Sequence, residues 1–244
     1  MPAPLATQSF STLVEQEPAL RALRQAHAAV PQEARRKAAA WDYETSMAQE
    51  LLNAIPSMAK PSKTPPSWPT GILALCIDPT YGPALLSVGA LEYQYGRPTD
   101  AMHLFKQLLT LDAQVEPDLI IILDKAGTFL IDQNDLPRAQ ELYAAASQRF
   151  PEDHTCLAAM AYTLARQGRP QEAIPLMRQV IALRPQDAEL LNDLGFALME
   201  CGEFTESESF LTQAITFAEP RYKLPQRNLE ELRRRMAGRH SGPP

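Results

Sequence analysis

The sequence predicts an all-α protein, an α-solenoid of helix-turn-helix repeats closed by a C-terminal capping helix. Three kinds of residue recur at an interval of 34 residues and carry this prediction. They are the leucines Leu123, Leu157 and Leu191, the small residues Ala139, Ala173 and Ser207, and the turn-forming residues Asn134, Gly168 and Gly202. A fixed period of this length is typical of stacked supersecondary units that each pack on their neighbours.

The first 31 residues are expected to hold a tail and one extra helix. Residues 1–10 contain two prolines and little pattern, so they are predicted to be disordered. An amphipathic helix is predicted from Ser11 to Val30, with Pro18 close enough to its start to be tolerated. Pro31 then interrupts the pattern.

Residues 32–81 are expected to form an atypical first repeat. Its first helix is predicted over 32–55, which is rich in good helix formers, and its second over 70–77. Between them, residues 56–69 contain five prolines and are predicted to be an inserted loop, because each proline removes a backbone donor and clashes with the preceding turn. Trp68 in this loop is expected to anchor it on the repeats; the alternative is an exposed contact for a partner.

Residues 82–221 are expected to form four repeats, over 82–115, 120–153, 154–187 and 188–221. In each repeat the first helix should end at a residue that tolerates a left-handed backbone, namely Gly96, Asn134, Gly168 and Gly202. Small residues at two positions per repeat predict that the paired helices cross closely. Residues 222–244 are expected to form a capping helix and a disordered tail, because a terminal repeat needs a polar cover.

These repeats resemble the tetratricopeptide repeat. The Leu-Gly pair of that motif is literal in Leu194-Gly195 and softened in Val88-Gly89 and Ala126-Gly127, while its leading Trp is Leu in every unit. The resemblance covers residues 82–221 well and 32–81 weakly. It implies a right-handed solenoid whose concave face binds peptides.

Composition and motifs argue against several classes of function. The net charge of −6 argues against general nucleic-acid binding, and three widely spaced cysteines form neither a disulfide framework nor a metal site. The apolar runs are too short to span a bilayer and no secretory signal is visible, so we expect a cytoplasmic protein without membrane insertion. With no phosphate loop, nucleophile elbow or paired histidines, we expect no catalytic residues, no metal and no cofactor.

Helical spacing places one face of each first helix opposite the face that packs on its partner. The resemblance implies that this free face lines the concave surface. The candidate partner-binding residues are Tyr93, Asp124, Lys125, Thr128, Asp132, Tyr162, Arg166, Asn192, Phe196 and Met199. Aromatic and Met side chains would form a semi-apolar floor, and the acids around it would favour a partner with basic and apolar residues. Alternatively, the aromatic side chains pack on neighbouring helices, a reading slightly favoured for Phe196.

The resulting functional hypothesis is a non-enzymatic scaffold or adaptor that holds a segment of another protein in the concave groove. Two alternatives remain open at this point: a dedicated chaperone or assembly factor for one client, and a regulatory subunit of an enzyme complex that docks through residues 56–69. A homo-oligomer is compatible with each of the three.

Overall fold

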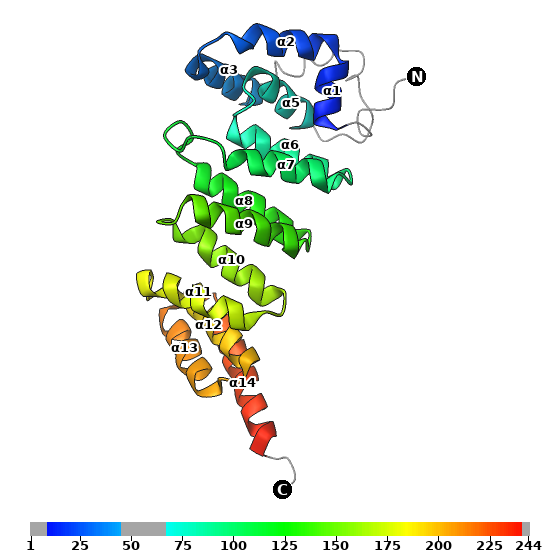
Figure 1. The fold of residues 1–244 in the computed structure, drawn as a ribbon. Helices are drawn as coiled ribbons and strands as arrows, with labels where there is room; N and C mark the ends of the chain where they lie inside the picture. The colour runs from blue at the N-terminus through cyan, green and yellow to red at the C-terminus, as the bar shows by residue number, and fades with distance from the viewer. Residues whose placement is uncertain (1–8, 45–66, 241–244) are drawn as a thin grey trace. The chain divides into compact units, whose positions relative to one another are not determined.

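The computed structural model describes residues 9–44 and 67–240, and every regular element in these residues is an α-helix (Figure 1). The helices are α1 (Phe10–Gln16), α2 (Pro18–Ala28), α3 (Gln32–Glu44), α5 (Ser67–Ile77), α6 (Gly82–Gln94), α7 (Pro98–Leu108), α8 (Leu119–Asp132), α9 (Leu136–Arg149), α10 (His154–Arg166), α11 (Pro170–Leu183), α12 (Ala188–Cys201), α13 (Phe204–Phe217) and α14 (Leu224–His240). Consecutive helices pack on one another, as in α6 on α7, α10 on α11 and α12 on α13. The predicted all-α repeat fold is thereby confirmed.

The chain divides into two compact units, Met1–Phe129 and Leu130–Pro244, and the division falls within α8. We describe each unit by itself. The pairs α6–α7, α10–α11 and α12–α13 lie within the expected ranges 82–115, 154–187 and 188–221. The boundaries of the repeats themselves stay a prediction.

The turn residues adopt the predicted backbone conformation. Gly96, Asn134, Gly168 and Gly202 have φ angles of 78°, 58°, 75° and 82°, and Asn134 is the one non-glycine residue with positive φ in the described part of the chain. A left-handed residue after a helix lets the chain satisfy the last carbonyl groups and turn back. The left-handed conformation predicted at these four turns is therefore confirmed.

Close helix crossings also lie where the small residues predicted them. A Cβ atom added to Gly195 of α12 would lie 2.7 Å from Cγ of Leu211 in α13. One added to Gly89 of α6 would lie 2.5 Å from Cε1 of Phe105 in α7. Only a residue without a side chain allows these backbones to approach so closely.

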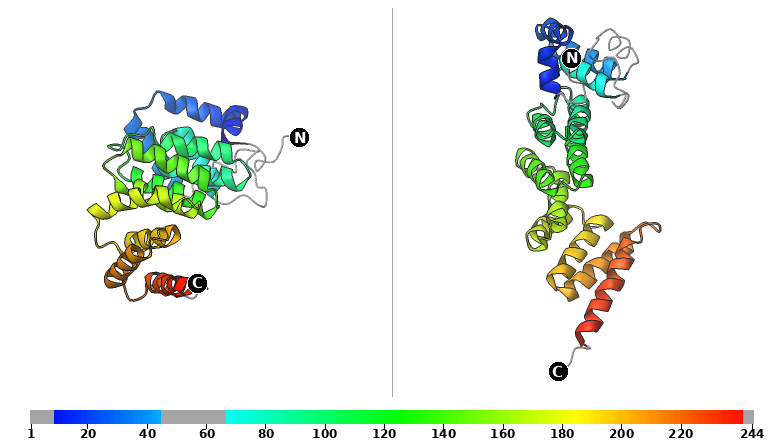
Figure 2. Two further views of the ribbon diagram at one scale, coloured as in Figure 1. Left: turned by 60° about the horizontal axis from the view of Figure 1, so that its bottom comes forward. Right: turned by 90° about the vertical axis from the view of Figure 1, so that its right-hand side faces the viewer.

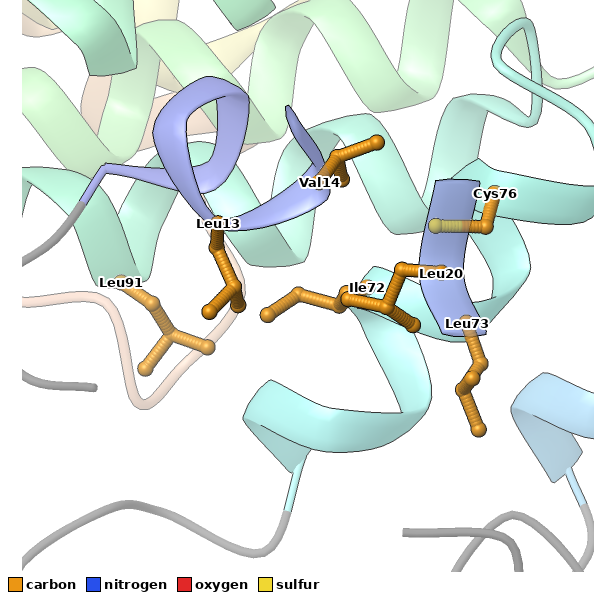
Figure 3. Packing of buried hydrophobic residues seen from close by; sticks show 7 residues of the cluster. All are labelled: Leu13, Val14, Leu20, Ile72, Leu73, Cys76 and Leu91. Atoms are coloured by element: carbon orange, nitrogen blue, oxygen red, sulfur yellow. The ribbon is translucent and has the colours of Figure 1, made fainter. Parts of the chain in front are cut away.

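The N-terminal segment forms two helices instead of the single predicted helix over 11–30. Proline disfavours helical geometry in the residue before it, and Glu17 is extended, with φ −87° and ψ 111°. Pro18 thus opens α2 at a position that needs no backbone donor. Leu13 and Val14 of α1 and Leu20 of α2 pack against α5, as Figure 3 shows for the cluster with Ile72, Leu73, Cys76 and Leu91.

Helix α5 begins earlier than predicted. The predicted loop ran to residue 69 and the helix began at residue 70, but α5 starts at Ser67 and includes Trp68 and Pro69. Pro69 falls in the first turn, where a proline removes no intrahelical hydrogen bond. Residues 45–66 lie outside the described residues, and with them the end of the predicted 32–55 helix and most of the 56–69 insertion.

Helix α14 packs along α12 and α13 in the C-terminal unit (Figure 2). Leu229 and Leu232 of α14 join Met199 of α12 and Leu211 of α13 in one buried cluster. Arg235 pairs with Glu200 and Arg233 with Glu208, so charged groups surround the cluster. None of the described helices has the length and apolar character needed to cross a membrane.

Candidate functional site

A mostly apolar pocket of about 190 Å³ lies in the C-terminal unit, where α10, α12 and α14 meet. We call this concavity the Phe196 pocket. Its lining consists of Tyr162, Ala165, Arg166, Met177, Asn192, Asp193, Phe196, Leu224 and Asn228. Tyr162 and Arg166 come from α10, whereas Asn192, Asp193 and Phe196 come from α12. The pocket therefore brings together four of the residues predicted from the sequence: Tyr162, Arg166, Asn192 and Phe196.

The walls of this pocket carry exposed apolar side chains. Tyr162 is 36% exposed, Phe196 39% and Leu224 44%. Most large apolar side chains in the described residues are buried, so three exposed ones around a single concavity indicate a binding surface. From the sequence Phe196 was slightly favoured as a packing residue, but in the structure it is 39% exposed and lines the pocket.

Met199 lies in the core. It is 1% exposed and packs under α14, which covers the end of the face that the sequence left open. It does not line the Phe196 pocket and is therefore not part of the candidate contact surface.

Hydrogen bonds join three polar residues that line the pocket, Asn228, Asn192 and Asp193. The side chain of Asn228 in α14 donates a hydrogen bond of 2.8 Å to Oδ1 of Asn192, and Nδ2 of Asn192 donates one of 3.3 Å to Oδ1 of Asp193. Asn192 is 1% exposed, so its amide is committed to these two neighbours. Together they tie α14 to α12 beside the opening.

Asp193 is an unusual carboxyl group. Burial raises its pKa to about 6, with smaller contributions from Glu189 and Asp187, while the hydrogen bond from Asn192 acts in the opposite direction. Burial likewise raises the pKa of the Tyr222 phenol to about 12, and Asp193, Glu189 and Asp187 add to that shift. Two separate groups thus experience the same negative potential at this side of the pocket.

Arg166 is held by Tyr162. Its guanidinium donates a hydrogen bond of 3.0 Å to the Tyr162 hydroxyl and lies 5.7 Å from the centre of the ring. Both contacts keep this cation on the aromatic wall of the pocket.

A second hollow of about 240 Å³ adjoins the Phe196 pocket. Its lining shares Ala165 and Phe196 with the Phe196 pocket and adds Gly168, Pro170, Gln171, Ala197 and Glu200. Phe196 therefore lines two adjoining depressions, an arrangement suited to an extended segment that places one side chain in each.

The predicted residues Tyr93, Asp124, Lys125 and Thr128 belong to the N-terminal unit and are described with it. Tyr93 packs edge-to-face on Phe129 with ring centres 5.6 Å apart, as the packing alternative expected. Lys125 and Thr128 are exposed on α8 and Asp124 is half-buried. Asp132, the last residue of α8, is exposed in the C-terminal unit.

The sequence analysis missed Glu92 in the N-terminal unit. Its side chain is fully buried, accepts a hydrogen bond from the backbone N–H of Phe10 and pairs with Arg97. Burial raises the pKa of this carboxyl group, against the effect of the Arg97 and Phe10 contacts. The signal was present: Glu92 occupies an inward position of α6 that should be apolar by helical spacing.

A polar pocket of about 160 Å³ adjoins Glu92 and is lined by residues of α1, α2, α5, α6 and α7. Within this lining, Glu92 is already engaged by the backbone N–H of Phe10 and by Arg97. Across the residues the structure describes, no group of three or more His, Cys, Asp or Glu side chains is arranged to hold a metal ion.

Comparisons with known proteins agree with the repeat fold. Residues 164–223, which include Phe196, match the family model described as tetratricopeptide repeat. MamA 41-end from Desulfovibrio magneticus RS-1 is a similar solved structure, with 18% identity, a TM-score of 0.50 and coverage of 64% of this chain and 85% of that one. The Sgt2 TPR domain from Aspergillus fumigatus has 19% identity, a TM-score of 0.46 and coverage of 50% and 83%. No curated protein sequence matches significantly. The MamA likeness concerns the fold alone.

Proposed function

We propose, from the match of residues 164–223 to the tetratricopeptide repeat and from the repeat fold, that this chain is a non-enzymatic scaffold or adaptor that binds a segment of another protein at the Phe196 pocket. The observation that carries the proposal is the gathering of Tyr162, Phe196 and Leu224, each more than a third exposed, around one concavity. Exposed aromatic side chains in a pocket with a polar rim are the usual anchors of protein interfaces.

The helices that build the pocket also support this role. Phe196 stands on α12, which is held from behind by the close Gly195–Leu211 crossing and from the side by the Asn228–Asn192 hydrogen bond. Rigid support of an exposed side chain lowers the entropy that a partner must overcome on binding. The two hollows beside Phe196 match an extended segment rather than a small compact ligand.

A selection of random peptides displayed on phage, with the full chain immobilised, tests the proposal. Selected peptides are then measured by fluorescence anisotropy on the wild type and on Phe196→Asp. We expect the substitution to weaken binding by about tenfold or more, because it removes an aromatic anchor and places a charge in an apolar site.

The matched control is Leu183→Asp, which alters a side chain that is 56% exposed in the same unit but outside the pocket. It should change affinity by less than about twofold, as expected for a residue outside the contact surface. Tyr162→Ala is a second pocket variant in case Phe196→Asp perturbs folding, which circular dichroism would reveal. Equal effects of the pocket and control variants would overturn the proposal.

A further inference from the structure

The Phe196 pocket combines exposed apolar side chains with one half-buried acid, and this combination favours a particular guest side chain. Tyr162, Phe196 and Leu224 supply the apolar lining, and Asp193 supplies a carboxylate. A purely apolar guest would cover that carboxylate and leave its charge uncompensated, which costs free energy. A guest with an apolar stem and a cationic end would satisfy both parts.

The bonding of Asp193 leaves room for such a cation. A carboxylate can accept about four hydrogen bonds, yet among the described residues the Asp193 side chain receives the Asn192 amide, at 3.3 Å, as its hydrogen-bond donor. The charged groups that act on it from its own helix and its N-cap are Glu189 and Asp187, which are both negative. From the segment before α14 it faces Tyr222, a neutral phenol under the same negative potential.

The cations near the pocket are engaged elsewhere. Arg166 lies on Tyr162 through a hydrogen bond and a ring contact. Arg184 forms an ion pair with Asp187, the N-cap of α12, with 3.5 Å between Nη1 and Oδ2. Among the described residues, neither arginine forms an ion pair with Asp193, so its carboxylate remains available to a cation of the partner.

We propose that the Phe196 pocket accepts a lysine or arginine side chain of the partner segment, with its aliphatic stem against Tyr162 and Phe196 and its charged end at the Asp193 carboxylate. This inference rests on the proposed function and specifies the chemistry of the partner. The carboxylate supplies a charge-assisted hydrogen bond to the cationic end of the guest. The hollow beyond Phe196 takes the neighbouring side chain.

The proposal predicts that the affinity of the pocket for a basic segment depends on pH. A bound cation favours the ionised form of Asp193, whereas at pH 5 only about a tenth of a carboxyl group with a pKa of about 6 is ionised in the free protein. Binding at pH 5 must therefore release a proton. We expect affinity for a basic segment to fall about tenfold between pH 7.5 and pH 5.

The test uses lysine-containing peptides from the random selection and a matched partner of each, in which the lysine is replaced by norleucine, which keeps the four-carbon chain and lacks the charged amino group. On the wild type at pH 7.5 the norleucine peptide should bind about tenfold more weakly, a typical cost for losing a charge-assisted contact to a shielded acid. On Asp193→Asn the ratio of the two dissociation constants should fall to near one. On Glu230→Gln, an exposed acid of α14 outside the pocket, the ratio should stay as in the wild type.

The outcomes separate this inference from the proposed function. If selected peptides lose affinity on Phe196→Asp but show a norleucine-to-lysine ratio near one, or a ratio that Asp193→Asn leaves unchanged, the function stands and the basic guest is wrong. If the selected peptides depend on Phe196 but contain no lysine or arginine, the function likewise stands and the basic guest is wrong. If no selected peptide depends on Phe196, both proposals fail.

Discussion

The hydroxyl of Ser207 donates a buried hydrogen bond of 2.6 Å to the carbonyl oxygen of Gly195, across the crossing of α12 and α13. The other repeats carry Ala101, Ala139 and Ala173 at the equivalent position. Ser207→Ala keeps the shape of the crossing and removes one donor, so it should lower the free energy of unfolding by about 1 kcal/mol. Ser207→Val adds bulk where none fits and should cost about 1–3 kcal/mol. Urea denaturation measures both; an alanine variant less stable than the valine variant would contradict this reading.

Gly195 itself should not tolerate a side chain. The methyl group of Gly195→Ala would lie 2.7 Å from Cγ of Leu211, and the backbone nitrogen of Leu211 is only 3.2 Å away. We expect a loss of about 1–3 kcal/mol through forced separation of the helices. Gly238→Ala in α14 is the matched control, because its methyl group would meet nothing within 4 Å. That variant should gain up to about 1 kcal/mol from helix propensity. Thermal unfolding that ranks the two variants in the opposite order would refute the prediction.

The local features of the fold were predictable because each depends on residues close in sequence. A left-handed turn needs Gly or Asn at one position, and a close crossing needs a small residue on each helix. The repeat showed where these positions recur, as Asn134 and Gly195 illustrate. The break at Pro18 was predictable in principle, since the residue before a proline avoids the helical region.

The candidate site was less predictable because long-range packing decides which part of a helix face stays open. Helical spacing placed Phe196 and Met199 on one face of α12. Helix α14, which follows in sequence, covers Met199 and leaves Phe196 exposed. Spacing within α12 contains no information on where a later helix will lie. The partial burial of Asp193 could not be predicted either, because it also depends on long-range packing and an acid on a polar helix face usually remains in water.

The buried pair of Glu92 and Arg97 offers a third test, in the N-terminal unit. The corresponding inward positions of the later repeats carry Leu130, Leu164 and Leu198, all nearly inaccessible. Glu92→Leu should therefore fit the space but remove the carboxylate that pairs with the mostly buried Arg97, at a cost of about 3–5 kcal/mol. The backbone N–H of Phe10 also loses its acceptor, which loosens α1.

A double-mutant cycle separates these effects. Glu92→Leu combined with Arg97→Leu removes both charges, and the double variant should be more stable than the sum of the single variants predicts, by about 1–3 kcal/mol. Hydrogen exchange of α1 amides should still be faster than in the wild type, because the Phe10 contact stays lost. Additive free energies in the cycle would show that the two charges stabilise the fold independently.

Asp193 should make stability depend on pH in a direction opposite to that of a salt-bridged acid. Its pKa is raised from 3.8 to about 6, so the folded protein binds the proton more tightly than the unfolded chain. Stability contributed by the protonated form is complete below pH 4 and is lost as pH rises from 4 to 6, by at most about 3 kcal/mol. Asp193→Asn has no proton to lose. Its stability relative to the wild type should therefore increase between pH 4 and pH 7, whereas Glu230→Gln should show no such trend. Urea denaturation between pH 4 and pH 7 measures the free energy of unfolding of each variant. If the free energies of the wild type and Asp193→Asn change in parallel with pH, the carboxylate is solvated in the folded state and the pocket holds no unsatisfied charge.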